Sequence, residues 1–493
     1  MSGDRRRVTA QALVSAIVTA CLLAGCGSQL QPDEVQAASV SSVVEQISAT
    51  TIDDAPVAPP PPADTTPDIS LPRDSSDADV VTLAPNPLAP DDQARAVPGP
   101  DTESPKPTDG RPAAGSCDGF DNSVGITDET ITIGNAADVS GPQPGIFEAS
   151  QDAVRAYVAY FNATSDICGR KLALTAYDTR TDGVAEQEAY TRGCQEVFAM
   201  IGSMSAFDAS GAGTAASCGL PDLRTAGITP ERINCRTCFG ALSSNPGEFQ
   251  NAIPDFVLKQ YGDAGQHAAM FYINIGAAPD NAKAQVKIFE KRGMNFDIVQ
   301  AIDIAEFNYT PYAQQMKDAG IKYVQMIGSD STAVRLAQAM QQQSFKPVVF
   351  MNDPSVYKPA YASAGGTAVE GSVVFTSLTP FEEADRNPEL RLYTSWLDQV
   401  RPGVEPTFFG AYAWSAARLF VEQAAALGGR LDRESLVSAV RRVDGWTSQG
   451  MHAPQRVGIK RVGECNRFIE LRQGRWVPVG GTKYTCTGTT TVN

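Results

Sequence analysis

Short apolar runs alternate with longer amphipathic stretches from about Cys117 onward. The apolar runs are rich in β-branched residues, as buried strands are, and they fall at residues 131–134, 172–174, 198–201, 270–273, 298–302, 323–327, 348–351 and 373–375. The stretches between and after them have helical periodicity, at residues 146–162, 183–197, 254–261, 281–292, 331–343, 390–400, 409–427 and 433–443. Strands and helices in alternation predict parallel sheets covered by helices.

This alternating series runs twice, which predicts two lobes. The second group begins near His267, and residues 243–246 (Ser-Ser-Asn-Pro) form a crossing point before it. We assign the residues as follows: 117–246 with about 377–450 to the first lobe, and 247–376 with part of 451–493, including a C-terminal hairpin, to the second. The predicted fold class is α/β, with two Rossmann-like lobes that have parallel sheets, helices on both faces and a hinged ligand cleft between their strand ends.

The N-terminal segment has the pattern of an export signal. Arg5, Arg6 and Arg7 precede an apolar run at residues 10–23, which is too short to span a bilayer comfortably. The run ends in Leu23-Ala24-Gly25-Cys26, which resembles the lipobox of bacterial lipoproteins. That resemblance implies removal of residues 1–25 and lipidation of Cys26, where several acyl chains would anchor the protein stably. The alternative is a plain signal peptide with an incidental cysteine.

Residues 26–116 differ from the rest in composition. They are mostly Pro, Ala, Asp, Ser and Thr, so they cannot bury enough apolar surface to fold, and we interpret them as a disordered tether. The alternative is a small domain, for which the apolar residues 40–47 could form a helix, but no partner segment accompanies them. The net charge of −16 leaves no basic footprint for nucleic acid.

Eight cysteines remain when Cys21 and Cys26 are set aside, an even number typical of an oxidising compartment. Cys465 and Cys486 flank the predicted terminal hairpin, and we pair them. Cys235-Arg-Thr-Cys238 has the spacing of a redox motif but lacks a preceding strand and a following helix, so we interpret it as a local disulfide instead of a redox or zinc site. Spacing does not fix the other pairs, for which we expect Cys194–Cys218 and Cys117–Cys168.

Catalytic machinery is hard to assemble from this sequence. His267 and His452 are the only histidines, and the sequence has no Gly-x-Ser-x-Gly elbow, phosphate-binding Walker loop or His-Glu-x-x-His pair. Residues 211–216 satisfy a loose dinucleotide fingerprint, but a long gap separates them from the preceding strand, so small-residue helix packing explains them better. We therefore predict no enzyme, no cofactor and no metal site, and we set aside a secreted hydrolase.

The loop after the strand at 198–201 is the strongest candidate for a ligand site. Gly202 lets the backbone approach a ligand closely, and free amides with the hydroxyls of Ser203 and Ser205 at a helix start would form a seat for a carboxylate. The alternative is a well-capped helix without any ligand.

Several motifs in order, over about three hundred residues, resemble one family. They are Ile131-Thr-Ile-Gly, Ser140-Gly-Pro-Gln-Pro-Gly, Ile201-Gly-Ser-Met-Ser, Leu220-Pro-Asp-Leu-Arg-Thr, Phe307-Asn-Tyr-Thr-Pro-Tyr and Phe409-Gly-Ala-Tyr-Ala-Trp-Ser-Ala-Ala. Together they resemble type I periplasmic binding proteins, specifically the branched-chain amino-acid (Leu/Ile/Val) substrate-binding proteins of ABC transporters.

The resemblance implies a two-sided ligand site. The first lobe would hold the ligand carboxylate with Ser203, Ser205 and Thr225, with Ala206 and Ala226 nearby. The second lobe would contribute from its strand ends, with Asp353 meeting the α-amino group beside Asn274 or Ile275 and Ser329. Two features depart from the family pattern. Arg224 is charged where a small polar residue is usual, so it would either pair a second ligand carboxylate or lie on the surface, and the tip at Asn274 lacks the usual aromatic and acidic residues.

These observations predict a lipid-anchored protein on the extracytoplasmic face of the cell membrane. It would capture an amino acid of the branched-chain type, or a similar small polar solute, and deliver it to the permease of an ABC transporter. The alternative is a ligand sensor or scaffold at the cell surface that has the same fold and no role in transport.

Overall fold

The computed structural model describes residues 114–493. The predicted signal at 1–25, the lipid site Cys26 and most of the predicted tether at 26–116 lie outside the described residues. The end of that segment is already in contact with the fold, because the Gly115 amide donates to the Ala425 carbonyl at 2.9 Å and the Ser116 carbonyl accepts from the Gly429 amide at 2.7 Å. Within residues 114–493, no helix is both long enough and apolar enough to cross a membrane.

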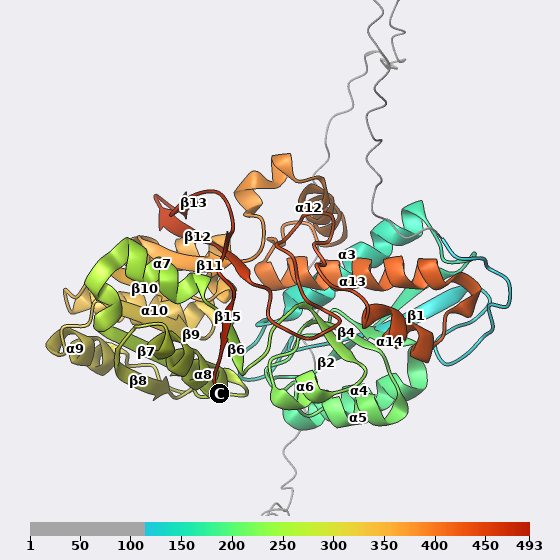
Figure 1. The fold of residues 1–493 in the computed structure, drawn as a ribbon, viewed down its shortest axis with the longest axis horizontal. Coiled ribbons are helices and arrows are strands. Elements are labelled where there is room, and N and C mark those ends of the chain that lie inside the picture. The colour runs from blue at the N-terminus through green and yellow to red at the C-terminus, as the bar shows by residue number, and fades with distance from the viewer. Residues whose placement is uncertain (1–113) are drawn as a thin grey trace, which may run out of the picture. The chain divides into compact units, whose positions relative to one another are not determined.

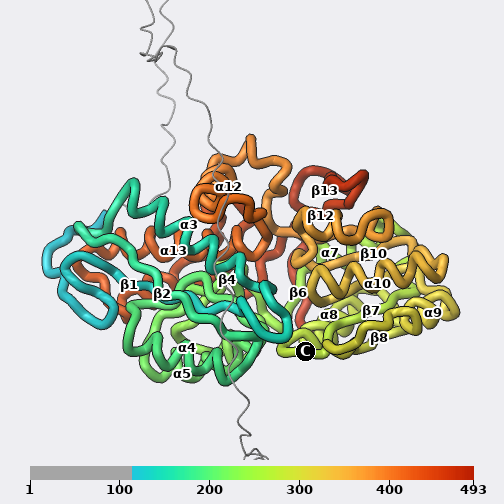
Figure 2. The backbone as a smooth tube through the Cα atoms, turned by 180° about the vertical axis from the view of Figure 1, so that it is seen from behind, coloured from blue at the N-terminus to red at the C-terminus, as the bar shows by residue number. Residues whose placement is uncertain are grey.

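The first sheet is entirely parallel and has the strand order β2-β1-β3-β4-β5. Its strands are β1 (Thr130–Ala137), β2 (Lys171–Asp178), β3 (Ala199–Ile201), β4 (Asp222–Ala226) and β5 (Cys238–Leu242). Runs such as Ala199–Ile201 are fully buried, as expected for a parallel sheet covered on both faces. Figures 1 and 2 show helices on both sides of it.

The helices of the first sheet come from two distant parts of the chain. The early ones are α3 (Glu148–Thr164), α4 (Gly183–Glu196), α5 (Ala212–Cys218) and α6 (Pro230–Asn234), and the late ones are α12 (Pro388–Val400), α13 (Phe408–Leu427) and α14 (Arg433–Val440). Helix α13 is apolar on nearly all sides and packs against α3 and β4, with Trp414 buried beside Tyr157 at a ring distance of 4.8 Å. A helix that is apolar all round belongs in a core, and α13 joins the early and late parts of the chain.

The second sheet has the strand order β13-β12-β11-β10-β9-β7-β8. Its parallel strands are β7 (Ala268–Ile273), β8 (Phe296–Ile302), β9 (Tyr323–Ile327), β10 (Val349–Asn352) and β11 (Ser372–Thr376). The hairpin of β12 (Cys465–Arg472) and β13 (Arg475–Val479) adds two antiparallel strands at one edge. The alternation predicted from the sequence is therefore confirmed, as is the α/β fold class with parallel sheets and covering helices.

Five helices and three short 3₁₀ turns accompany the second sheet within the described residues. The helices are α7 (Ala252–Tyr261), α8 (Ala278–Lys291), α9 (Thr310–Asp318), α10 (Asp330–Gln342) and α11 (Pro359–Gly365), and the turns are η1 (Gly262–Gln266), η2 (Pro354–Val356) and η3 (Gly366–Ala368). Two further turns, η4 (Phe381–Arg386) and η5 (Gly428–Arg430), flank the late helices. The apolar faces of the five helices, α7 to α11, form clusters on the two sides of the second sheet.

A small two-stranded sheet holds the C-terminal end of the chain. Strand β15 (Thr489–Thr491) pairs antiparallel with β6 (Glu248–Gln250), and the short β14 (Thr485–Cys486) pairs with the start of β12. The Thr489 hydroxyl donates to Glu248 Oε1 at 2.5 Å, and the Thr490 hydroxyl donates to Asn251 Oδ1 at 2.6 Å. The sequence did not predict this pairing, because β6 and β15 are only three residues long and are separated by about 240 positions in the chain.

Four disulfides join the eight cysteines of the described residues. The pairs are the ones that the sequence analysis expects, namely Cys117–Cys168, Cys194–Cys218, Cys235–Cys238 and Cys465–Cys486. The Cys235–Cys238 bridge follows helix α6 and leads into β5, so its order of elements is opposite to that of a thioredoxin site. Cys238 is 1% exposed, which suits a structural bridge.

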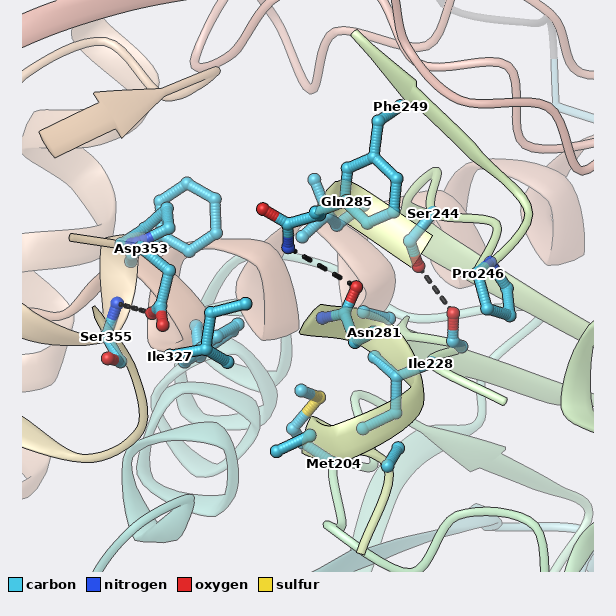
Figure 3. A pocket seen from close by; sticks show the side chains of 18 of the residues that line it. Met204, Ile228, Ser244, Pro246, Phe249, Asn281, Gln285, Ile327, Asp353 and Ser355 are labelled. Atoms are coloured by element: carbon cyan, nitrogen blue, oxygen red, sulfur yellow. Dashed lines mark hydrogen bonds between the residues drawn. The ribbon is translucent and has the colours of Figure 1, made fainter. Parts of the chain in front are cut away.

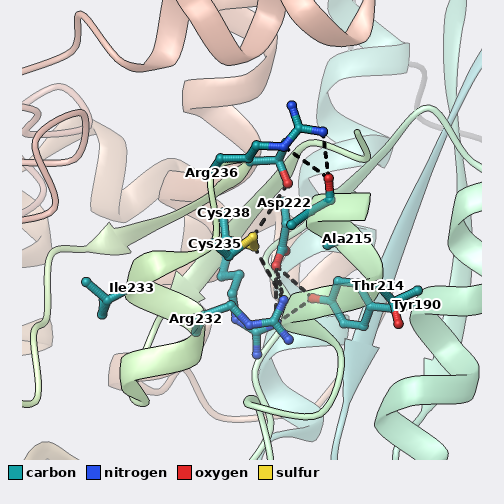
Figure 4. The surroundings of a disulfide bond; sticks show 12 residues. Tyr190, Thr214, Ala215, Asp222, Arg232, Ile233, Cys235, Arg236 and Cys238 are labelled. Atoms are coloured by element: carbon teal, nitrogen blue, oxygen red, sulfur yellow. Dashed lines mark hydrogen bonds and ion pairs between the residues drawn. A yellow bond between two sulfur atoms is a disulfide. The ribbon is translucent and has the colours of Figure 1, made fainter. Parts of the chain in front are cut away.

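A buried cluster of charges lies beside the Cys235–Cys238 bridge (Figure 4). Arg232 is bonded to Asp222 at 2.7 Å and to Glu186 at 3.0 Å, and Arg224 lies 3.5 Å from Glu186 and 3.4 Å from Asp222. Burial raises the pKa of Glu186 to about 7, although the two arginines act in the opposite direction. The expectation that Arg224 lies on the surface is wrong, since its side chain is fully buried in this cluster. Its pairing with a second ligand carboxylate stays a prediction.

The Gly-rich segment at 211–216 forms the start of the short helix α5 and packs against α4. A Cβ atom on Gly211 would lie 2.3 Å from the ring of Tyr190. This close approach supports helix packing as the reason for the small residues, as the sequence analysis proposes.

Candidate functional site

A cavity of about 240 Å³ lies at the carboxyl ends of strands from both large sheets. From the first sheet it is lined by the segments that follow β1, β3, β4 and β5, and from the second by those that follow β7, β9, β10 and β11. Strand β6 and the first turns of α8 and α13 complete the wall. Small ligands bind at such strand ends in open α/β sheets, so this cavity is the candidate site.

The wall of the cavity is mainly apolar. Figure 3 shows Met204, Ile228, Phe249 and Ile327 around the open space. The larger set of apolar side chains consists of aliphatic and aromatic residues from both sheets: Ile146, Phe147, Met204, Ile228, Leu242, Phe249, Ile273, Ile275, Ile327, Phe375, Phe408, Phe409 and Val462. A ligand in such a cavity would gain most of its binding energy from burial of its own apolar surface.

Two carboxylates line the cavity, and one of them is fully paired. Glu248 accepts hydrogen bonds from Arg461 Nε at 2.7 Å, from the Val462 amide at 3.3 Å and from the Thr489 hydroxyl. Burial alone would raise the pKa of Glu248, but these hydrogen bonds outweigh it and hold the pKa below its usual range. Glu248 and Arg461 therefore act as a structural pair that ties β6 to the C-terminal segment.

The second carboxylate, Asp353, follows strand β10 and begins the turn η2. Its Oδ1 atom accepts the Ser355 amide at 2.8 Å, as Figure 3 shows. Burial raises the pKa of Asp353, and the hydrogen bond from Ser355 only partly opposes this. The structure places Asp353 at the cavity, where the resemblance leads us to expect it, and its role toward a ligand stays a prediction.

Ser203 and Thr225 do not line the cavity. Both are fully buried, the Ser203 hydroxyl accepts the Ala136 amide at 3.0 Å, and the Thr225 hydroxyl donates to the Gly202 carbonyl at 2.9 Å. These bonds join the neighbouring segments β1, β3 and β4. The structure therefore places both hydroxyls inside the first sheet, and their expected role in holding a ligand carboxylate stays a prediction.

Ser205 and Ala206 do form an anion seat, but the protein fills it. The carboxylate of Asp138 accepts the Ala206 amide at 2.8 Å, the Ser205 hydroxyl at 3.3 Å and the Thr181 amide at 3.0 Å, and it is also bonded to the Thr179 hydroxyl. Asp138 itself is fully buried. These groups bind a carboxylate, as the sequence predicts, but the carboxylate in the structure belongs to Asp138 of the chain itself.

The remaining predicted residues divide between the cavity and its surroundings. Ala206 and Ala226 line the cavity, and so does Ile275, whereas Asn274 is exposed and does not. Ser329 is also outside the lining of the cavity. Its hydroxyl caps α10 by accepting the Thr332 amide.

Sequence reasoning missed two groups of residues that shape the cavity. Asp138 directly follows the first strand, and an acid at a strand end was the signal that could have identified it. The aromatic residues Phe147, Phe249 and Phe409 were the second omission, and only their positions after strands and at crossing points could have indicated a shared wall. Within residues 114–493, no group of three or more His, Cys, Asp or Glu side chains is placed to hold a metal.

Comparison with known proteins then decides the family. The family model described as periplasmic binding protein matches residues 130–470, which extend from β1 into β12 and so include the first sheet and every parallel strand of the second. The chain belongs to the periplasmic binding protein family. No curated protein matches this chain significantly.

Solved structures of periplasmic binding proteins share this fold at low sequence identity. A fatty acid ABC transporter substrate-binding protein from Thermomonospora curvata is 17% identical, with a TM-score of 0.62 over 73% of this chain and 94% of that one. A branched-chain amino acid transporter substrate-binding protein from Streptococcus pneumoniae, in complex with isoleucine, is 12% identical, with a TM-score of 0.59 over 71% and 98%. A solute-binding protein from R. palustris, in complex with 4-hydroxybenzoate, is 17% identical, with a TM-score of 0.58 over 74% and 97%.

Proposed function

We propose that this protein is the extracytoplasmic solute-binding component of an ABC transporter and that Cys26 anchors it to the membrane through lipid. The observation that carries the proposal is the apolar cavity at the strand ends of both sheets in a periplasmic binding protein. The fold neighbours include ABC transporter substrate-binding proteins, which supports a transport role. The cavity is proposed to take a small organic solute.

Closure around the solute is proposed as the mechanism, and no bond of the solute needs to change. The Ala277 amide, which follows β7, donates to the carbonyl of Ala206, which follows β3, at 3.2 Å. Gly276 has a φ of 52°, and a Cβ atom there would lie 2.3 Å from the Ala206 oxygen. A glycine is therefore needed where the two loops meet, and this contact would form as the cleft closes.

The two lobes are proposed to move as bodies about the segments that cross between them. The proposed lobes are residues 117–246 with about 377–450, and residues 247–376 with part of 451–493. One crossing segment, residues 243–246, lies in the cavity wall, so a ligand there would contact a hinge as well as both lobes. A ligand that binds the closed form better shifts the population toward it.

Transport is tested by deleting the gene and screening uptake of the solute found in the native protein. Organic extraction of the full-length protein, followed by mass spectrometry, identifies that solute. Slower uptake in the deletion strain, together with isolation of the anchored protein with a permease, is the expected result. Unchanged uptake and isolation with a signalling partner would favour a sensor or scaffold instead.

Lipid anchoring is tested separately from binding. Replacing Cys26 with Ser should release the protein from the membrane fraction or prevent its processing, and the solute affinity of the isolated protein should not change. Cys21→Ser is the matched control, because Cys21 lies within the segment that is predicted to be removed. Membrane association that survives Cys26→Ser would contradict the proposed anchor.

A further inference from the structure

The anion seat at Ser205 and Ala206 is occupied by Asp138, so it is not available to a ligand carboxylate. Asp138 uses the Ala206 amide and the Ser205 hydroxyl, and the Ala206 carbonyl is bonded to the Ala277 amide. Ala206 therefore lines the cavity with both of its backbone polar groups already engaged. A ligand carboxylate would have to displace Asp138, a buried carboxylate with its own set of donors.

The lining supplies no positive charge to an anion. Among the described residues that line the cavity there is no Lys, Arg or His, and the nearby Arg461 is committed to Glu248 in a two-point contact. The charged side chains in the wall are Glu248 and Asp353. A buried anion without a partner is strongly disfavoured, and two acids in the wall add to that effect.

Helix N-termini could replace a cation, and the N-terminal ends of α3, α8 and α13 all reach the cavity. In the first turn of α8, Pro279 has no N–H group, the Ala277 amide is bonded to Ala206, and the Ala278 amide is bonded to the Ile275 carbonyl. In the first turn of α13, the Thr407 hydroxyl accepts the Gly410 amide at 3.0 Å. Helix α8 therefore presents no group of free amides of the kind an anion site requires, whereas at α13 only the Gly410 amide is capped and α3 has no side-chain cap.

Neutral polar groups in the wall do lack partners. Ser243 Oγ and Asn466 Nδ2 have no hydrogen-bond partner in the described structure, although Ser243 is 4% exposed and Asn466 is 3% exposed. Both residues line the cavity. Buried polar atoms without partners are uncommon, and a ligand hydroxyl or carbonyl would satisfy them without carrying a charge.

The cavity volume sets the size of the ligand. An apolar cavity of about 150 Å³ holds benzene, which has six non-hydrogen atoms. By proportion, the 240 Å³ cavity holds roughly ten non-hydrogen atoms. A small aromatic or branched aliphatic molecule has this size.

We propose that the cavity binds an uncharged, largely apolar organic molecule with a hydroxyl or carbonyl group, and that it rejects amino acids and carboxylates. This inference rests on the proposed function and specifies its ligand. It follows from an anion seat filled by Asp138, a wall without cations, and unpartnered neutral groups at Ser243 and Asn466. The expected solute differs from the amino acid that the sequence predicted.

The test compares molecules that share a skeleton and differ in charge. Isothermal titration of the full-length protein would use 4-hydroxybenzamide against 4-hydroxybenzoate, hexanamide against hexanoate and hexylamine, and isoleucine. The amides should bind at least about 30-fold more tightly than the matched carboxylates, because a buried anion would lack a partner. Tightest binding of isoleucine, of a carboxylate or of the amine would overturn the inference and leave the proposed function standing.

A single substitution should reverse this preference. Asn281 lies in the first turns of α8 at the cavity, and Asn281→Lys would add the missing cation there. Hexanoate should then bind about 10-fold more tightly than to the natural protein, whereas the matched control Asn281→Gln should leave hexanoate binding unchanged. Equal hexanoate affinity in Asn281→Lys and Asn281→Gln, in protein with an unchanged Tm, would contradict the electrostatic argument.

The experiments distinguish an error in the proposed solute capture from an error in the proposed ligand class. If none of these probes binds and extraction of the native protein releases no small molecule, then solute capture itself is wrong, and the inference falls with it. If extraction releases an amino acid or a carboxylate, solute capture stands and the uncharged ligand is wrong. Release of an uncharged apolar compound supports both.

Discussion

Strand β4 connects two contrasting regions, the charge cluster behind the first sheet and the cavity at its carboxyl end. Asp222 and Arg224 at the beginning and middle of the strand are fully buried among Glu186 and Arg232. Ala226 at the end of the same strand lines the cavity. Within five residues the chain changes from charged side chains that form buried ion pairs to an alanine in a cavity wall without cationic side chains.

Polar side chains near the strand ends of the first sheet form hydrogen bonds within the protein and leave few groups for a ligand. Arg224, Ser203 and Thr225 have the side chains that recognise a carboxylate, yet each is bonded to other groups in or beside the first sheet. Asp138 completes this arrangement by occupying the donors at Ser205 and Ala206. A polar residue near a strand end is therefore evidence of a ligand contact only when its hydrogen-bonding groups are free.

The largest expected effect comes from breaking the charge cluster. Arg232→Met should lower the free energy of unfolding by about 3–5 kcal/mol, because Asp222 and Glu186 would remain buried with fewer partners. Urea unfolding measures this loss. Ligand affinity of the folded protein should stay the same, since Arg232 does not reach the main cavity.

Arg192→Met is the matched control for the cluster. Arg192 is exposed and pairs with Glu196 at 3.2 Å on the surface of α4, so its loss should change the free energy of unfolding far less than the loss of Arg232. Equal losses in Arg192→Met and Arg232→Met would show that the buried cluster has no special role in stability.

A smaller effect concerns a buried group that stays neutral. Burial lowers the pKa of His452 to about 4, and its Nε2 atom lies 2.8 Å from the Ser415 hydroxyl. The unfolded chain binds a proton near pH 6.5 and the folded chain only near pH 4, so stability is full above pH 6.5 and is lost as the pH falls toward 4. The loss between pH 7 and pH 4.5 should be roughly 2 kcal/mol from this residue.

His452→Gln should remove that part of the pH dependence, measured by urea unfolding at both pH values. The exposed His267→Gln is the matched control and should retain it, because His267 is 48% exposed. An identical pH dependence in His452→Gln and the natural protein would show that His452 is not a neutral buried group.

A still smaller effect concerns the cavity wall that β15 supports. Thr489→Val removes the hydroxyl that donates to Glu248 and should lower stability by about 1 kcal/mol. Affinity for 4-hydroxybenzamide should fall only a few-fold, because β6 keeps its main-chain pairing and the Arg461 bond to Glu248. Calorimetry measures both, with Thr491→Val as a control on the same strand. A larger loss of affinity than of stability would assign Thr489 to the ligand.

Much of the fold could be predicted from the sequence. Apolar periodicity located the predicted strands and helices to within a few residues; α13, expected at 409–427, forms at Phe408–Leu427. It did not identify β5, α9 or α11, which are short. The four cysteine pairs also agree with the structure. The pairing of β6 with β15 could not be predicted, since three-residue strands carry little pattern and their partners are far apart.

The site could be predicted only in outline. The loop after β3 was recognised as a carboxylate seat, and Asp353 and Ala226 were expected where the cavity lies. The occupant of the seat was not found, because a bond between Asp138 and Ala206 joins residues 68 positions apart and depends on how β1 and β3 align. Tertiary geometry, which no local motif encodes, decides whether a donor is free.

The most direct test of the account is to empty the seat. Asp138→Ala should leave the donors at Ala206, Ser205 and Thr181 unpaired, and 100 mM sodium acetate should then raise the Tm of the variant by a few degrees relative to sodium chloride at equal concentration. The natural protein and Asp138→Asn should show no acetate-specific increase. If acetate fails to raise the Tm of the folded Asp138→Ala protein, or raises that of the natural protein equally, the claim that Asp138 fills the carboxylate seat is wrong.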